Sequence, residues 1–436
     1  MRQPRAVNPA VSRIVTAAIT SNARRDLARA AAGLKRRLSG SEPVVDYFHQ
    51  VDDPYSQLMA QLLAPLRDRY GVRLRCWLVP PPPDSAAPER ERLKAYARRD
   101  APRVAAEYRL AFPPGAAQPS AEACDLAARA LAAALEAGAF AEAAAEIGAV
   151  LWAGDLAGLS ARPLAASAVG ALAAGEDERE RLGHYLGAML HFEGEWCWGV
   201  DRLNHLEERL AGLGLDGRPG EPPLAPHRDL SLGPVPDGPG AVIEAWFSFR
   251  SPYSWIALPR VRRLARHYGA ELRLRPILPM VMRGLPVPRV KSRYIVLDTK
   301  READRVGLPF GRMVDPVGAG AERALAVIHR AIPLGRGEDF AELGLRAAFA
   351  DGIVLAQDGG LFDVARRAGL RDDETRAALA DDSWRAPAEA NRAALFEAGL
   401  WGAPTYRVNG GPAHWGQDRL WALEQDVVAA MRGNQA

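Results

Sequence analysis

Two segments of this 436-residue chain begin and end with the same patterns, and this internal repeat constrains the fold more than any other feature. Residues 43–48 and 242–249 are short β-forming runs. Each is followed by a helical pattern that opens with Asp-Pro-Tyr-Ser or Ser-Pro-Tyr-Ser and stops at a glycine, and then by a second β-rich run. Later the segments read WGVDRLNHLE from Trp198 and WGQDRLWALE from Trp415, with seven of ten positions identical. The concordant order of these matches predicts two copies of one α/β fold.

A stretch rich in glycine and proline separates the two copies. Between residues 217 and 240, 12 of 24 residues are glycine or proline, which excludes a helix or a central strand there. We therefore predict a first domain at residues 41–212, a linker at 213–241 and a second domain at 242–436.

The first 40 residues form a separate basic extension. They contain nine Arg or Lys and one acid, Asp26, and the alanine-rich part from Val11 to Leu38 is predicted to be helical. The segment lacks the apolar core of a secretory signal, but transit peptides share its arginine-rich, acid-poor composition. The alternative is a solvated basic helix packed on the protein surface.

Composition excludes several classes of function. The chain has 56 basic and 53 acidic residues, a balance that gives no support to a nucleic-acid partner, and no apolar run is long enough to span a bilayer. Its three cysteines, Cys76, Cys124 and Cys197, form no CxxC pair and have no metal-ligand spacing. We expect no metal site and no disulfide framework.

Ser251, at the predicted junction of strand and helix in the second copy, is the leading candidate for catalysis. A serine followed by proline is the typical start of a helix, because the hydroxyl can cap a backbone N–H that Pro252 does not need. The same helix N-terminus attracts anions, so a thiolate or carboxylate could bind there. The first copy has Asp53 at this position, and its charge would repel an anion. The second copy is therefore the better candidate for an active site.

Further candidates follow in the second copy. The bond between Ala403 and Pro404 can be cis, and eleven residues before Trp198 the first copy has Gly187 with no proline nearby. Gln417 or Asp418 can be the N-cap of a last helix running to about Met431, or can hold a substrate ammonium group.

Lys291 is one of only four lysines in a chain that otherwise uses arginine. A lysine in such a chain can be kept for its compact charge, although chance or a surface position explains it better. The tryptophans of this copy are expected to serve mainly in packing.

With these motifs in view, residues 242–436 resemble the DsbA-type thioredoxin-fold proteins. Within them the segment is most similar to the branch of 2-hydroxychromene-2-carboxylate isomerase and the kappa-class glutathione transferases. Residues 41–212 look like a more divergent copy. The resemblance rests on five stretches: FSFRSPYSW (247–255), LRLRPIL (272–278), GLPFGRMVDP (307–316), GAPTYRV (402–408) and HWGQDRLWAL (414–423).

The resemblance implies two tandem thioredoxin-like domains, each with a large helical insertion between its second and third strands. Ser251-Pro252-Tyr253-Ser254 stands where the redox branch has CxxC, so thiol–disulfide exchange is not expected. By position, Ser251 would stabilise the thiolate of bound glutathione.

The other positions carried over concern glutathione binding. Ala403 and Pro404 would contact its cysteinyl part, and Gln417 and Asp418 its γ-glutamyl group. Lys291 would lie near the substrate or the glycyl carboxylate. An asparagine of the kappa class has no counterpart here, where Arg283 and Gly284 stand.

The resemblance thus predicts a cytoplasmic, glutathione-dependent isomerase or transferase, and the composition, rich in arginine, alanine and glycine, suggests a bacterial source. Its partner would be a small molecule, with aromatic compounds among the options, and not a nucleic acid or a membrane. The protein would be a homodimer, or a monomer whose two copies imitate one. The alternatives are a thioredoxin-fold binding module without catalysis and a DsbA-family protein of other function.

Overall fold

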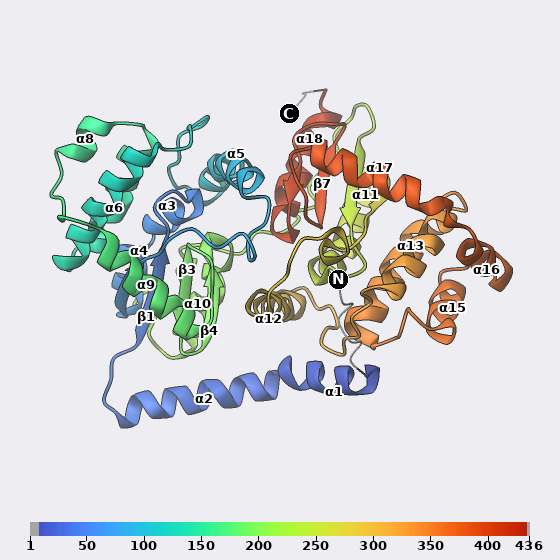
Figure 1. Cartoon of the computed structure of the whole chain (residues 1–436), viewed down its shortest axis with the longest axis horizontal. Coiled ribbons are helices and arrows are strands. Elements are labelled where there is room, and N and C mark those ends of the chain that lie inside the picture. Colours follow the sequence, from blue (N-terminus) through green and yellow to red (C-terminus); the bar gives the residue numbers. More distant parts are fainter. Residues whose placement is uncertain (1–7, 434–436) are drawn as a thin grey trace. The chain divides into compact units, whose positions relative to one another are not determined.

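The computed structural model describes residues 8–433, and within them the chain forms two compact units (Figure 1). The N-terminal unit is Ala28–Arg228, and the C-terminal unit combines residues 8–27 with residues 229–433. Each unit is a mixed α/β structure with one four-stranded sheet. Among the described residues, no helix is long and apolar enough to cross a lipid bilayer.

The N-terminal unit has strand order β2-β1-β3-β4, with β1 parallel to β2 and antiparallel to β3. Five helices lie between its second and third strands, as the sequence predicts for an insertion. The elements are β1 (Val44–His49), α3 (Pro54–Ala60), α4 (Leu63–Tyr70), β2 (Arg73–Leu78), α5 (Arg90–Tyr108), α6 (Ala121–Glu136), α7 (Phe140–Trp152), α8 (Leu156–Ser160), α9 (Val169–Leu182), β3 (Met189–Phe192), β4 (Glu195–Trp198) and α10 (Gly199–Gly212).

The C-terminal unit repeats this order as β6-β5-β7-β8, with β5 parallel to β6 and antiparallel to β7. Its sheet elements are β5 (Val242–Phe247), α11 (Pro252–Tyr268), β6 (Glu271–Pro276), β7 (Thr405–Val408), β8 (His414–Trp415), η4 (Gln417–Arg419) and α18 (Leu420–Met431). Its inserted helices are η1 (Met280–Arg283), α12 (Arg289–Arg305), α13 (Ala319–Ala331), α14 (Gly337–Arg346), η2 (Ala347–Asp351), α15 (Asp358–Arg367), α16 (Asp372–Ala380), η3 (Asp382–Trp384) and α17 (Arg385–Glu397).

The first helix of the N-terminal unit departs from the prediction of one continuous helix up to Gly71. It is divided into α3 and α4, and it ends as predicted at Gly71, whose φ of 57° is left-handed. Pro65 explains the break, because proline has no N–H for the carbonyl of Gln61 and its ring crowds that carbonyl. The side chain of Gln61 bonds instead to the backbone of Ala111.

The predicted helix from Val11 to Leu38 is also wrong as a single element. The structure has α1 (Pro9–Ile19) and α2 (Asn22–Leu38). At the break, the hydroxyl of Thr20 donates to the carbonyl of Thr16 at 2.7 Å. Polar residues such as Thr, Ser and Asn form such local bonds readily, and this favours a helix end over a helix interior.

The strands of the two sheets pair in the same register. By this register the residue equivalent to Pro404 is Ala188, not Gly187. Met189 pairs with Trp198, and Thr405 pairs with Trp415. The N–H of Gly199 donates to the carbonyl of Ala188 at 2.7 Å, and the N–H of Gly416 donates to that of Pro404 at 2.9 Å. Counting back from the tryptophans was wrong by one residue, because the β3–β4 hairpin is one residue shorter than β7–β8.

In each unit, the same kind of hydrogen bond joins the helix that follows the first strand to a helix of the insertion. The hydroxyl of Tyr55 donates to Asp100 of α5 at 2.8 Å, and the hydroxyl of Tyr253 donates to Asp298 of α12 at 2.7 Å. Both aspartates are buried. Tyr253 follows Tyr55 by 198 residues, and Asp298 follows Asp100 by the same number. The correspondence of the units therefore extends into their insertions.

The segment from 217 to 240 has no helix or strand, as its glycines and prolines predict, and a buried glutamate in each unit holds part of it. Glu207 accepts from the N–H groups of Leu224 and Ala225 at 2.7 and 3.0 Å. Glu424 accepts from the N–H groups of Ser231 and Leu232, both at 2.6 Å. The segment is therefore bound at two points to the bodies of the units.

Candidate active site at the start of α11

Ser251 is the N-cap of α11 and lies four residues after the end of the central strand β5. Its Oγ accepts a hydrogen bond from the N–H of Ser254 at 3.2 Å, and Pro252 occupies the first helical position. The predicted N-cap is thus confirmed. Ser251 is partly exposed, so a ligand can reach the hydroxyl and the first N–H groups of α11, where the helix dipole favours negative charge.

The hydroxyl of Ser251 reaches the loop before β7. It donates to the carbonyl of Ala403 at 2.9 Å, across 152 residues of sequence. The Ala403–Pro404 bond is cis, as the resemblance implies. Ala403 is partly exposed and Pro404 is buried. The structure therefore brings together three of the residues predicted for the site.

Arg250, the cation next to Ser251 in sequence, is already paired. Its guanidinium donates to both oxygens of Asp315, with shortest distances of 2.7 Å. Because this pair neutralises the arginine, the positive character beside Ser251 comes mainly from the helix N-terminus.

Lys291 lies in the first turn of α12, on the side that packs against α11. It precedes Asp298 by seven residues, or two helical turns, so both project from the same face of α12. Asp298 bonds to Tyr253, which follows Ser251 by two residues. Burial lowers the pKa of Lys291 to about 8. Lys291 therefore carries its charge at neutral pH but loses it in mildly alkaline solution.

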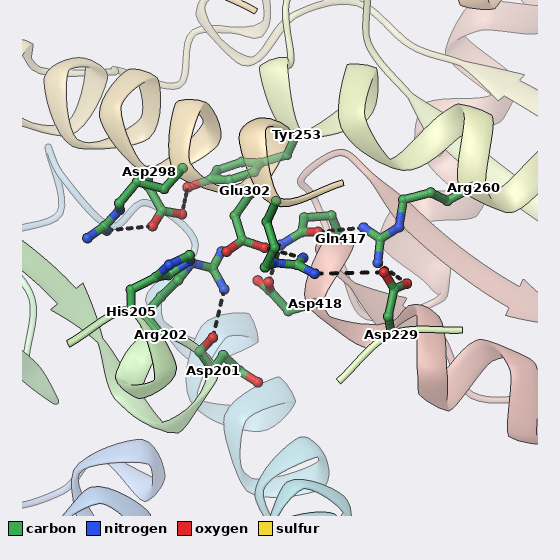
Figure 2. A network of polar contacts seen from close by, with 12 residues as sticks. Asp201, Arg202, His205, Asp229, Tyr253, Arg260, Asp298, Glu302, Gln417 and Asp418 are labelled. Carbon is green, nitrogen blue, oxygen red and sulfur yellow. Dashed lines mark hydrogen bonds and ion pairs between the residues drawn. The ribbon is translucent and has the colours of Figure 1, made fainter. Parts of the chain in front are cut away.

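Gln417 lies in a buried network of charged groups rather than at an open surface (Figure 2). Its amide oxygen accepts from Arg260 at 2.7 Å. Its amide nitrogen donates to Glu302 at 2.8 Å and also to Asp418. Arg260 in turn pairs with Asp229. The amide of Gln417 thus has a protein partner at each of its polar atoms.

The prediction that Gln417 or Asp418 caps the last helix is wrong. Residues Gln417–Arg419 form a 3₁₀ turn whose N-cap is Gly416, and α18 begins at Leu420. The buried network explains the difference, because it engages the side chain of Gln417 and leaves it unable to cap the backbone. The predicted end of the helix at Met431 is confirmed.

The sequence interpretation missed two contributors to the site region. Tyr253 and Asp298 position α12, and their counterparts at the same spacing in the first copy were a usable signal. Arg283 donates to the carbonyl of Trp401 at 2.8 Å and to that of Leu278 at 3.1 Å, which holds the approach to the cis-proline loop. The bond from Arg283 to Trp401 joins residues far apart in the chain, so no local sequence pattern indicates it.

Two other features bear on where a ligand can bind. An open hollow of about 740 Å³ is lined by Arg262, Arg266 and Glu342, toward the other end of α11 from Ser251. Among the described residues, no group of three His, Cys, Asp or Glu side chains could hold a metal ion.

Comparison with known proteins agrees with this architecture. Residues 242–428 match the family described as DSBA-like thioredoxin domain. A 2-hydroxychromene-2-carboxylate isomerase of Pseudomonas sp. (strain C18) is 25% identical over 197 residues, which are 43% of this chain and 91% of that protein. The C-terminal unit thus contains a DsbA-like thioredoxin domain with a distant isomerase relative.

Two solved structures are also similar to part of the chain. A 2-hydroxychromene-2-carboxylate isomerase structure is 22% identical, with a TM-score of 0.39, and the match covers 44% of this chain and 97% of that one. The cytosolic disulfide reductase DsbM from Pseudomonas aeruginosa is 19% identical, with a TM-score of 0.34, over 44% of this chain and 97% of that one.

Proposed function

We propose that the DsbA-like thioredoxin domain of the C-terminal unit is a glutathione-dependent isomerase or transferase, with Ser251 stabilising the glutathione thiolate. The observation that carries the proposal is the contact of the Ser251 hydroxyl with the Ala403 carbonyl at the N-terminus of α11. The isomerase relative supports the reaction class.

The hydrogen bond from Ser251 to Ala403 can be exchanged for a bond to a ligand. A peptide such as glutathione can offer its cysteinyl N–H to the carbonyl of Ala403. That carbonyl then has another donor, and the Ser251 hydroxyl can rotate its proton toward the glutathione sulfur. The hydroxyl can still accept from the N–H of Ser254, because donor and acceptor directions of a hydroxyl are separate.

The thiolate is the reactive form of glutathione in this proposal. A free thiol with a pKa of about 8.5 is mostly protonated at neutral pH. A hydroxyl donor and a helix N-terminus both stabilise the charged form, so they lower that pKa. The thiolate adds to one carbon of a polarised double bond and forms a C–S bond, while the π electrons move to the electron-withdrawing group. Rotation about the resulting single bond and loss of the thiolate give the isomer.

Lys291 and Asp418 complete the proposed glutathione site. Lys291 would attract the glycyl carboxylate, and its position on the α11-facing side of α12 supports this role. Gln417 is the weaker candidate for the γ-glutamyl group, because its amide is engaged by Arg260 and Glu302. We assign it to positioning Asp418.

The N-terminal unit is proposed to be a duplicated but catalytically inactive copy. It has Asp53 in place of Ser251, Ala188 in place of Pro404, and Leu93 at the helix position of Lys291. The Tyr55–Asp100 contact and the shared strand order support common ancestry.

Isothermal titration with glutathione tests the proposal on the full chain. We expect saturable binding by the wild type at millimolar glutathione or below, and at least tenfold weaker binding of the thiolate by Ser251→Ala. Asp53→Ala is the matched control, because it removes the N-cap of the other unit and should leave affinity unchanged. Failure of the wild type to bind at millimolar concentration would rule out glutathione as the cosubstrate.

A binding module without chemistry is the second candidate, because the proton of the Ser251 hydroxyl is already donated to the Ala403 carbonyl. In that case S-methylglutathione and glutathione would bind equally well at every pH, because the sulfur would have no partner. Tighter binding of glutathione than of S-methylglutathione, with a difference that grows as pH rises and the thiol ionises, would identify the enzyme.

A further inference from the structure

The helices α1 and α2 show an inverted pattern of polarity, with polar residues toward the protein and apolar residues outward. In α1 the polar side is fixed to the C-terminal unit. The hydroxyl of Ser12 donates to the carbonyl of Met313 at 3.0 Å, and the N–H of Met313 donates to the hydroxyl of Thr16 at 2.9 Å. Arg13 donates to the carbonyl of Gly352 at 2.6 Å.

The opposite side of α1 is apolar and exposed. Ile14 is 71% exposed, Val11 50%, Val15 47% and Ile19 43%. Residues at this spacing gather on one face of a helix, and here it is the face opposite to Arg13 and Thr16, with Ile19 at its edge. A surface helix normally buries its apolar face, so α1 leaves this face for another contact.

The second helix, α2, repeats the inversion. Toward the N-terminal unit, Arg29 forms two hydrogen bonds with Glu195 at 2.7 and 2.9 Å, and Arg36 donates to Glu193 at 2.9 Å. Gly33, between these arginines, is buried. The inner face of α2 is therefore held by ion pairs instead of by apolar packing.

Leucines occupy the outer face of α2. Leu38 is 79% exposed, Leu27 72% and Leu34 51%. At 3.6 residues per turn, these three side chains project within about 40° of one another. Residues 11–38 thus contain seven of the 13 large apolar side chains that are exposed in the described part of the chain. Scattered exposed leucines need no explanation, but a stripe on two successive helices does.

Exposed cations border the leucine stripe on both sides. Arg24 and Lys35 lie on one flank and Arg37 on the other, by the same helical geometry. Asp26 is the sole acid among the first 41 residues. Apolar side chains bordered by basic ones are typical of helices that lie in the interface of a membrane, with leucines among acyl chains and cations at anionic headgroups.

We propose that α2 forms a docking surface for an anionic lipid membrane, with Leu27, Leu34 and Leu38 inserted and Arg24, Lys35 and Arg37 at the headgroups. A second copy of the chain fits this surface less well. In a twofold contact the patch would face itself and bring its cations together with little acid to balance them. The sequence analysis predicts no membrane partner. It could not foresee this surface, because composition does not show which side chains are exposed.

Co-sedimentation of the full chain with vesicles tests the proposal. We expect binding to vesicles of phosphatidylcholine with phosphatidylglycerol, and at least tenfold weaker binding to phosphatidylcholine alone or in 0.5 M salt. The variant with Leu27→Gln, Leu34→Gln and Leu38→Gln should lose at least tenfold in partition coefficient. The matched control carries Leu156→Gln, Val169→Gln and Ile332→Gln, whose side chains are 38%, 72% and 38% exposed elsewhere, and should bind like the wild type.

Circular dichroism should show that both triple variants remain folded, since all six side chains are at the surface. Absence of wild-type sedimentation with anionic vesicles would overturn the proposal. So would equal loss of binding in the control variant. Dimerisation in the absence of lipid that the leucine variant abolishes would assign the stripe to a second copy of the chain instead.

Discussion

The two units begin their first sheet helix with the same geometry but with different chemistry. In the N-terminal unit, Asp53 accepts from the N–H groups of Tyr55 and Ser56 and from the hydroxyl of Ser56. In the C-terminal unit, Ser251 accepts from one N–H and keeps a proton, which it donates to Ala403. Either residue caps the helix. The comparison shows that stability needs only an acceptor, whereas binding a thiolate also needs a donor.

A second contrast lies at the neighbouring loop. The position of cis Pro404 is taken in the N-terminal unit by Ala188, which has a left-handed φ of 54°. The tyrosine–aspartate contacts of Tyr55 and Tyr253 are the same in both units. The features that hold the fold are thus shared, and those around the candidate site differ.

The largest expected effect is on stability, and it tests a feature that both units share, the buried glutamate that binds the linker. Glu207→Ala and Glu424→Ala each leave two backbone N–H donors and a buried tyrosine hydroxyl, of Tyr70 or Tyr268, without an acceptor, at a cost of about 1 to 3 kcal/mol per buried group. Each variant should therefore lower the free energy of unfolding of its own unit by at least about 3 kcal/mol. Hydrogen exchange read separately for each unit measures this.

The acid-to-amide variants Glu207→Gln and Glu424→Gln are the controls, since an amide oxygen still accepts. They should lose less than the alanine variants. A large loss for one glutamate and none for the other would break the structural equivalence of the two units.

The next effect tests the difference between the two caps. Bound to the wild type, glutathione should have a thiol pKa below its ordinary value of about 8.5, and Ser251→Ala should raise that pKa by at least about 1 unit, or about 1.4 kcal/mol. Thiolate absorbance measured against pH gives the value. Asp53→Ser, which copies the cap of the other unit, should leave it unchanged. A shift caused by Asp53→Ser would place thiolate binding in the wrong unit.

A smaller effect concerns the position of Lys291, which is Leu93 in the first copy. Burial lowers the pKa of Lys291 to about 8, so its charged form is lost as pH rises above 8. Affinity for S-methylglutathione, which has no titrating thiol, should fall by up to about tenfold between pH 7 and pH 9. Lys291→Arg keeps its charge and should reduce this fall to the part that comes from the ligand's own amine. Identical pH profiles for both proteins would remove Lys291 from the site.

The sequence predicts much of the fold because its signals are local. Strands, helix ends and the cap at Ser251 each depend on a few adjacent residues, and Gly71 and Gly269 end the helices that they follow. The repeat predicts that the two segments fold alike, and both sheets do have the same strand order.

The failures around the candidate site depend on features that no local pattern shows. The side chain of Gln417 turns away from the helix because Arg260 and Glu302 are buried beside it, and neither is near it in the chain. The alignment of Gly187 with Pro404 failed because hairpin length is invisible in a motif count. For the candidate site, the sequence indicated that Ser251 and Ala403 act together, but not that the serine proton is already engaged.

The smallest effect concerns the charge of the aspartate cap. Burial raises the pKa of Asp53 to about 6 from an ordinary value of 3.8, with the nearby Asp52 adding to the rise. A carboxyl with a raised folded-state pKa contributes stability below its unfolded pKa and loses it as pH rises through the folded value. Asp53→Asn keeps the cap and removes the charge, so it should abolish this loss between about pH 4 and pH 6. Because Asp53 is partly exposed, the gain at pH 7 should be at most about 1 kcal/mol. Thermal unfolding across this pH range measures it, and a variant less stable than the wild type at pH 7 would show that the hydrogen bonds from Tyr55 and Ser56 stabilise the ionised carboxylate more than burial destabilises it.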